Sequence, residues 1–69
     1  MYELKPDHAS AYYNKCIVLN VLGRKEEAIA ACDKAIKLEP DYAYAYYNKG
    51  WYLYTLGKYQ ESVTALNRQ

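Results

Sequence analysis

The most informative feature of the sequence is an internal repeat with a period of thirty-four residues. The block PDHASAYYNK at residues 6–15 returns as PDYAYAYYNK at residues 40–49. The same offset pairs Leu19 with Leu53, Leu22 with Leu56, Gly23 with Gly57, Glu27 with Glu61 and Ala31 with Ala65. A fixed period of this size is typical of a solenoid, whose units bury their apolar faces only against their neighbours. Because such an array offers a surface rather than an enclosed pocket, the sequence predicts a binding scaffold and not an enzyme.

The aromatic composition is unusual, because ten tyrosines and one tryptophan occur without any phenylalanine. A chain of 69 residues has room for one small domain, and such domains bury only about 60% of the surface that the unfolded chain exposes. A tyrosine combines a large apolar ring with a hydroxyl that needs water or a partner, so it suits a half-buried surface. Ten of them exceed what so small a core needs, which predicts aromatic rings at the surface.

The charges are balanced and mixed, with nine basic and eight acidic residues giving a formal net charge of +1. A nucleic-acid interface would concentrate Lys and Arg on one side, so we expect no nucleic-acid partner. No apolar run approaches the roughly 20 residues that span a bilayer, and the first residues do not resemble a signal peptide. We therefore expect no membrane partner and a cytoplasmic location. Cys16 and Cys32 fit that location as small, reduced core residues, with a disulfide as the less favoured alternative.

Apolar residues recur at the i, i+3, i+4, i+7 spacing of amphipathic helices. The pattern predicts four helices, over residues 9–22, 25–38, 42 or 43 to 56, and 59 to the C-terminus. Gly23 and Gly57 are suited to end the first and third helices, because Gly adopts the left-handed conformation without steric cost. Pro40 ends the second helix, because the residue before a proline is disfavoured in a helix. Short connections make neighbouring helices antiparallel, so the expected fold class is all-α, with stacked helix-turn-helix units.

These residues resemble the tetratricopeptide repeat, a thirty-four-residue unit with a sparse pattern of aromatic, small, Leu, Ala and Pro positions. The pattern is carried by Tyr12, Cys16, Leu19, Ala28, Ala35 and Pro40 in the first unit, and by Tyr46, Gly50, Leu53 and Ser62 in the second. The departures are Lys15 and Lys49 in place of a usual Leu, and Cys32 and Leu66 in place of the second aromatic residue. We expect the two lysines to keep their ammonium groups in water. The resemblance implies a short right-handed α-solenoid of about two repeats.

The resemblance also sets the expected domain organisation, which is a single domain over residues 1–69. Residues 1–8 copy the end of a repeat, residues 9–42 form the first repeat and residues 43–69 form a truncated second one. Such a chain is compatible with a fragment of a longer array and with an engineered short array. A truncated repeat leaves Val63 and Leu66 without a covering helix.

The first helix of each unit carries a stripe of residues that packing within one repeat does not use. In tetratricopeptide repeat proteins the first helices line a concave groove, and similar positions contact a bound peptide. The resemblance therefore implies a binding site formed by Tyr13, Asn14, Ile17, Asn20, Tyr44, Tyr47, Asn48, Trp51 and Tyr54. The alternative is that the rings among these residues pack on a neighbouring repeat or merely line the groove without binding a ligand. A clamp for a carboxylate tail, which some family members use, is disfavoured because it needs a Lys at the position of Tyr13.

No residue pattern predicts catalysis, a metal site or a cofactor. His8 is the only histidine, and Cys16 has no nearby base in the sequence. The three glycines occur singly, so no phosphate-binding loop is expected. Two functions follow as hypotheses: a module that binds a peptide or protein in the groove, or a building block that associates with its own copies into a homo-oligomer through uncapped ends.

Overall fold

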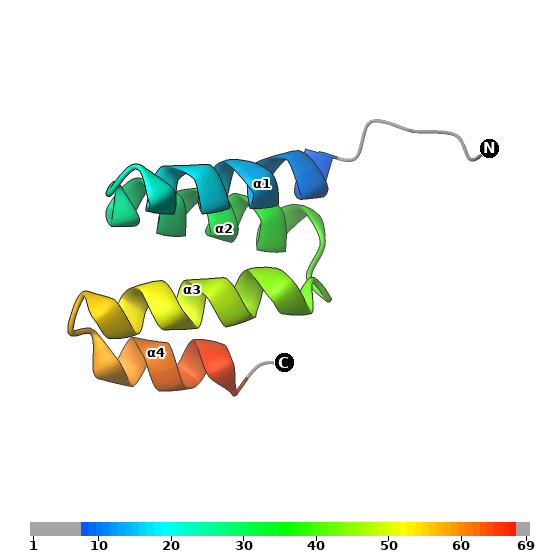
Figure 1. Cartoon of the computed structure of the whole chain (residues 1–69). Coiled ribbons are helices and arrows are strands. Elements are labelled where there is room, and N and C mark those ends of the chain that lie inside the picture. Colours follow the sequence, from blue (N-terminus) through cyan, green and yellow to red (C-terminus); the bar gives the residue numbers. More distant parts are fainter. Residues whose placement is uncertain (1–7, 68–69) are drawn as a thin grey trace.

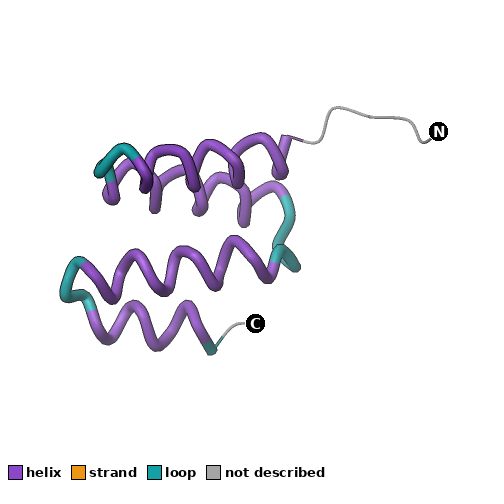
Figure 2. Tube along the Cα trace, viewed as in Figure 1, coloured by secondary structure: helices purple, strands orange, loops and turns teal. Residues whose placement is uncertain are grey.

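The computed structural model describes residues 8–67. It contains four α-helices: α1 (His8–Val21), α2 (Lys25–Leu38), α3 (Ala43–Thr55) and α4 (Tyr59–Leu66). They form two antiparallel helix hairpins, α1–α2 and α3–α4, that lie one on the other (Figures 1 and 2). The all-α prediction with stacked helix-turn-helix units is confirmed. The expected remnant of a repeat covered residues 1–8, of which residues 1–7 lie outside the described part of the chain, whereas His8 is the first residue of α1. The last two residues also lie outside the described part.

The two hairpin turns have the same geometry, as the repeat predicts. Gly23 and Gly57 have φ angles of 83° and 82°, in the left-handed region that favours glycine. In the first turn the Gly23 amide donates to the Asn20 carbonyl at 3.0 Å, and the Arg24 amide donates to the Leu19 carbonyl at 2.9 Å. The second turn repeats both bonds thirty-four residues later. Each glycine therefore ends its helix in a Schellman motif, which satisfies the last carbonyl groups.

The helix limits agree with the sequence to within one residue in the described part. The second helix has the predicted limits, whereas α1 begins and ends one residue earlier than predicted and α3 stops at Thr55. The residues after Val21 and Thr55 belong to the Schellman turns, where the chain already leaves the helix.

Small side chains let the helices approach closely. The buried apolar residues are Ala9, Cys16, Ala28, Ala31, Cys32, Ala35, Ala45, Tyr52, Leu53 and Ala65. Among the residues expected at the core, Leu19, Tyr12 and Tyr46 are only half-buried. Tyr52 was not predicted to be buried, yet it joins the central cluster from α3. It packs at the interface between the two hairpins, which we call the joint. The sequence prediction considered only packing within one repeat, so it did not include this interface.

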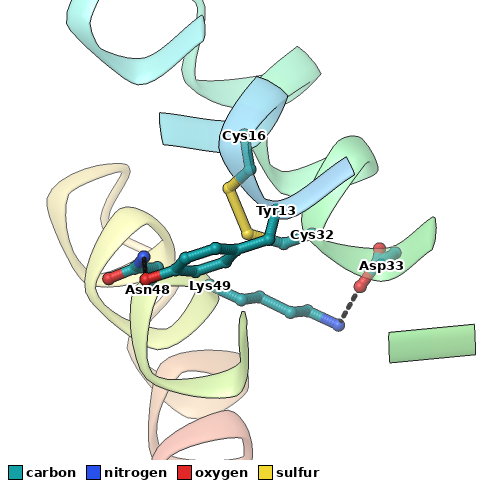
Figure 3. Close-up of a disulfide and its surroundings, with 6 residues drawn as sticks. All are labelled: Tyr13, Cys16, Cys32, Asp33, Asn48 and Lys49. Atoms are coloured by element: carbon teal, nitrogen blue, oxygen red, sulfur yellow. Dashed lines mark hydrogen bonds and ion pairs between the residues drawn. A yellow bond between two sulfur atoms is a disulfide. The ribbon is translucent and has the colours of Figure 1, made fainter. Parts of the chain in front are cut away.

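The cysteines are joined in a disulfide, so the expectation of a reduced pair was wrong (Figure 3). Cys16 and Cys32 are fully buried, and their Cα atoms are 5.5 Å apart, a spacing that suits a disulfide. They lie sixteen residues apart with Arg24, at the turn, midway between them. In an antiparallel pair of helices, residues equidistant from the turn lie at the same level. The expectation of a cytoplasmic location loses this support, because lasting disulfides are typical of oxidising compartments.

The second repeat makes the equivalent contact without sulfur. Gly50 and Leu66 occupy the positions of the two cysteines, thirty-four residues on. A Cβ atom placed on Gly50 would lie 2.6 Å from Leu66 Cγ, so the leucine fills the space that a side chain at residue 50 would need. Ser62 adds a hydrogen bond from its hydroxyl to the Gly50 carbonyl at 2.7 Å. The two repeats therefore close the same helix–helix contact by different chemistry.

Candidate protein-binding surface

The predicted site residues lie on α1 and α3, and the structure divides them into two groups. Tyr44, Tyr47, Trp51 and Tyr54 on α3 are exposed, with 42% to 69% of their surface accessible. The four residues Tyr13, Ile17, Asn20 and Asn48 are half-buried, and Asn14 is exposed. The exposed rings are open to a partner, whereas the half-buried Tyr13 and Asn48 contact each other across the two repeats.

Four rings form a continuous row on the second repeat, here called the aromatic row: Tyr47, Trp51 and Tyr54 from α3 and Tyr59 from α4. Their centroids are separated in turn by 6.2, 5.6 and 5.4 Å, and each pair meets edge to face. Such contacts favour ring pairs beyond the area that they bury. Tyr59 was missed by the sequence analysis, which considered only the first helix of each unit. The signal that could have found it is its place just after Gly57, where the hairpin returns to the end of α3.

A second aromatic cluster lies at the joint between the repeats. The Tyr13 ring is 5.1 Å from that of Tyr42 and 6.3 Å from that of Tyr44. The Asn48 side-chain amide donates a hydrogen bond of 3.0 Å to the Tyr13 hydroxyl (Figure 3). Tyr13 and Asn48 thus connect the two hairpins, and the packing alternative considered from the sequence describes them well.

The joint also contains an ion pair. The Lys49 ammonium on α3 lies 2.5 Å from the Asp33 carboxylate on α2 (Figure 3). The expectation that Lys49 keeps its ammonium in water was therefore incomplete, because the stem reaches across to the neighbouring repeat. Its counterpart Lys15 is exposed.

The predicted contact residues and Tyr59 carry many uncharged hydrogen-bonding groups. Tyrosine hydroxyls, the Trp51 indole N–H and the Asn14 amide all offer donors. In the described residues, one buried side-chain atom has no hydrogen-bond partner, the Asn20 Oδ1. All nine predicted site residues and Tyr59 are uncharged at neutral pH, so this surface does not favour a strongly charged ligand.

Each repeat also has a hollow on its surface, lined by residues other than the predicted contact residues. A hollow of about 390 Å³ is lined by Tyr46, Lys49, Leu53 and neighbouring residues, and the first repeat has a similar one at Tyr12, Lys15 and Leu19. Within residues 8–67, no three His, Cys, Asp or Glu side chains come together as a group that could hold a metal ion. Among the described helices, none is long and apolar enough to cross a membrane.

Comparison with known families agrees with the architecture. A family model of the tetratricopeptide repeat matches residues 9–42, and a second model of the same repeat matches residues 31–64. No curated protein matches the chain. The two matches together extend from α1 to α4, over the helices, turns and joint described above. The chain therefore belongs to the tetratricopeptide repeat family.

Proposed function

We propose that the chain binds an extended peptide or protein segment on the surface formed by the first helix of each repeat. Tetratricopeptide repeats generally mediate protein–protein interactions, and the family is typically a non-enzymatic interaction module. In this proposal the chain acts as one domain, with repeats over residues 9–42 and 43–69. The contact residues are those predicted from the sequence, together with Tyr59.

The observation that carries the proposal is the aromatic row. Its rings are exposed, yet each is held by an edge contact with the next. Rings that are already ordered lose little conformational entropy when a partner covers them, and aromatic side chains dominate binding hot spots. An extended segment fits this surface because its unpaired backbone carbonyls can accept hydrogen bonds from the Tyr, Trp and Asn donors. The absence of charge in the row favours a segment with few charged side chains.

The proposal can be tested with a library of random peptides displayed on phage and selected against the intact, oxidised protein. Affinity for the selected peptide would be measured by calorimetry and by the fluorescence of Trp51, the single tryptophan. We expect Tyr47→Ala together with Tyr54→Ala to weaken binding at least thirtyfold, because truncating a hot spot costs about 2 kcal/mol.

The matched control is Val18→Ala, which removes an exposed apolar side chain of α1 that is not a predicted contact. We expect it to leave the affinity unchanged. Circular dichroism would show that both variants remain folded. The proposal fails if selection yields no binding peptide, or if the tyrosine variant binds the selected peptide as tightly as the original protein does.

A further inference from the structure

The contact between the two repeats has two sides. In the described residues, the counterparts of each side, thirty-four positions away in the sequence, are exposed. On the second repeat, Ala45 and Tyr52 of α3 are buried. Tyr52 is only 9% exposed and lies in the central cluster with residues of the first repeat. The counterparts of Ala45 and Tyr52 on the first repeat are Ala11 and Val18, thirty-four residues earlier. Both are exposed, and Val18 has 56% of its surface accessible. Helix α1 of the first repeat therefore exposes the residues whose counterparts on α3 are buried inside the chain.

The other half of the joint recurs on the second repeat. Within the chain, Ile29 packs against the central cluster, and the Tyr13 hydroxyl accepts the hydrogen bond from Asn48. The counterparts of Ile29 and Tyr13 are Val63 and Tyr47. Both are exposed on the second repeat, Val63 to 56%. This surface presents the residue types that receive α3 inside the chain.

We propose that two copies of the chain associate head to tail, with α1 of one copy docked on α3 and α4 of the next. The contact repeats the joint that already holds the two repeats together. The Asn14 amide of one copy donates to the Tyr47 hydroxyl of the next, as Asn48 donates to Tyr13. Val18 packs toward Val63 and Leu66 of the next copy, as Tyr52 packs in the cluster of Ile29 and Cys32. Such a contact uses different surfaces on the two copies, so it continues into an open array rather than closing as a two-fold dimer.

Two residue differences between the repeats make the proposed contact between copies weaker than the joint within the chain. Val18 fills less space than Tyr52, and the position of Asp33 is occupied by Asn67, which cannot form an ion pair with Lys15. The formal net charge of +1 leaves little repulsion between copies. We therefore expect association that depends on concentration, in the range from about 10 µM to about 1 mM.

The test restores the two missing contacts and measures the sedimentation of the oxidised protein over that range of concentration. We expect Val18→Tyr together with Asn67→Asp to tighten association at least tenfold. Added salt should weaken this gain, because part of it comes from the new pair between Lys15 and Asp at position 67. Val63→Lys, which places a charge in the proposed contact, should keep the chain monomeric.

The matched control is Val21→Tyr, which adds the same ring to α1 at a residue that is 77% exposed and whose counterpart is the exposed Thr55. We expect it to leave association unchanged, since no contact at the joint corresponds to it. The proposal is overturned if the restored variant associates no more tightly than the original chain. It is also overturned if Val21→Tyr gives the same gain, because the association would then reflect added apolar surface alone.

Discussion

Tyr52 is the only aromatic side chain that is buried in the core of the described residues. It comes from α3 and contacts the cluster around the disulfide, so its phenol lies in the joint between the repeats. Burial raises the pKa of this phenol above its ordinary value of 10.0, and the nearby Tyr13 adds to the shift. The burial of Tyr52 between the repeats therefore makes the stability of the protein depend on the protonation state of its phenol.

The raised pKa predicts a loss of stability in alkaline solution. Below about pH 10 the phenol is protonated in the folded and unfolded states, so its full contribution is present. Above pH 10 the unfolded chain releases this proton while the folded chain keeps it. The free energy of unfolding then falls, by at most about 1.4 kcal/mol per pH unit, until the pH passes the pKa of the folded state. Urea unfolding followed by circular dichroism between pH 8 and pH 11 would measure the slope.

Tyr52→Phe provides the control, because it keeps the ring and removes the ionisable hydroxyl. We expect the variant to lose less stability than the original protein between pH 10 and pH 11. Parallel curves for the two proteins would contradict the prediction, since the other tyrosines would then account for the whole dependence.

At the scale of the helices, the two hairpins show two ways to hold a pair at close approach. In α1–α2 the contact is covalent, between Cys16 and Cys32. In α3–α4 a leucine side chain covers a glycine, and Ser62 bonds to the backbone of that glycine. Gly50 therefore leaves the space that the Leu66 side chain fills. Glycine in the interior of a helix lowers the free energy of unfolding by about 1 kcal/mol relative to alanine.

Gly50→Ala should change the stability with a sign that depends on Leu66. In the original protein the new methyl group would lie 2.6 Å from Leu66 Cγ, and overpacking of this kind costs about 1 to 3 kcal/mol. The better helix propensity of alanine offsets about 1 kcal/mol of that loss. We expect a net destabilisation of about 1 kcal/mol, measured by urea unfolding.

The same substitution in a Leu66→Ala background should stabilise the protein by up to about 1 kcal/mol, because the clash is absent and the helix propensity remains. The two backgrounds form a double-mutant cycle whose coupling energy reports the contact between residues 50 and 66. A change of the same sign and size in both backgrounds would show that Gly50 is not kept for the leucine.

At the scale of the whole molecule, the period of the sequence predicted the fold because each repeat places the same residues at the same turns and core positions. Gly23, Gly57 and Pro40 end helices through local backbone geometry, which a sequence shows directly. Tyr52 and the disulfide were missed for a different reason. Both depend on the distance and orientation between two helices. The periodic pattern of residues within one helix does not give either quantity.

The candidate site was predictable to a similar degree. The helical stripe predicts exposed rings on the third helix, and Tyr47, Trp51 and Tyr54 are exposed on α3. Tyr59 completes the row from another helix, so its place in the row depends on the arrangement of the hairpins. Tyr13 was predicted as a contact residue, and only its hydrogen bond with Asn48 of the other repeat depends on that arrangement. Whether the row binds a segment remains a prediction.

The disulfide makes the stability of the array uneven along its length. Cys16 and Cys32 enclose a loop with a sequence separation of 16 residues, and a cross-link of this size stabilises by about 3 kcal/mol in the chain-entropy model. The stability of a domain of 69 residues is itself about 3 to 10 kcal/mol. In an array the stability is a sum over repeats and their joints, so we expect the amides of α1 and α2 to exchange more slowly than those of α3 and α4.

Cys16→Ala together with Cys32→Ala should lower the free energy of unfolding by about 3 kcal/mol. Hydrogen exchange followed by NMR would locate the loss: α1 and α2 should lose most of their extra protection, because the cross-link acts on the loop that these helices form. Reduction of the original protein, confirmed by mass spectrometry, is the matched control and should reproduce the exchange pattern without any substitution. An equal loss of protection over all four helices would show instead that the two repeats unfold as one cooperative unit, with the joint at Tyr52 stronger than either hairpin.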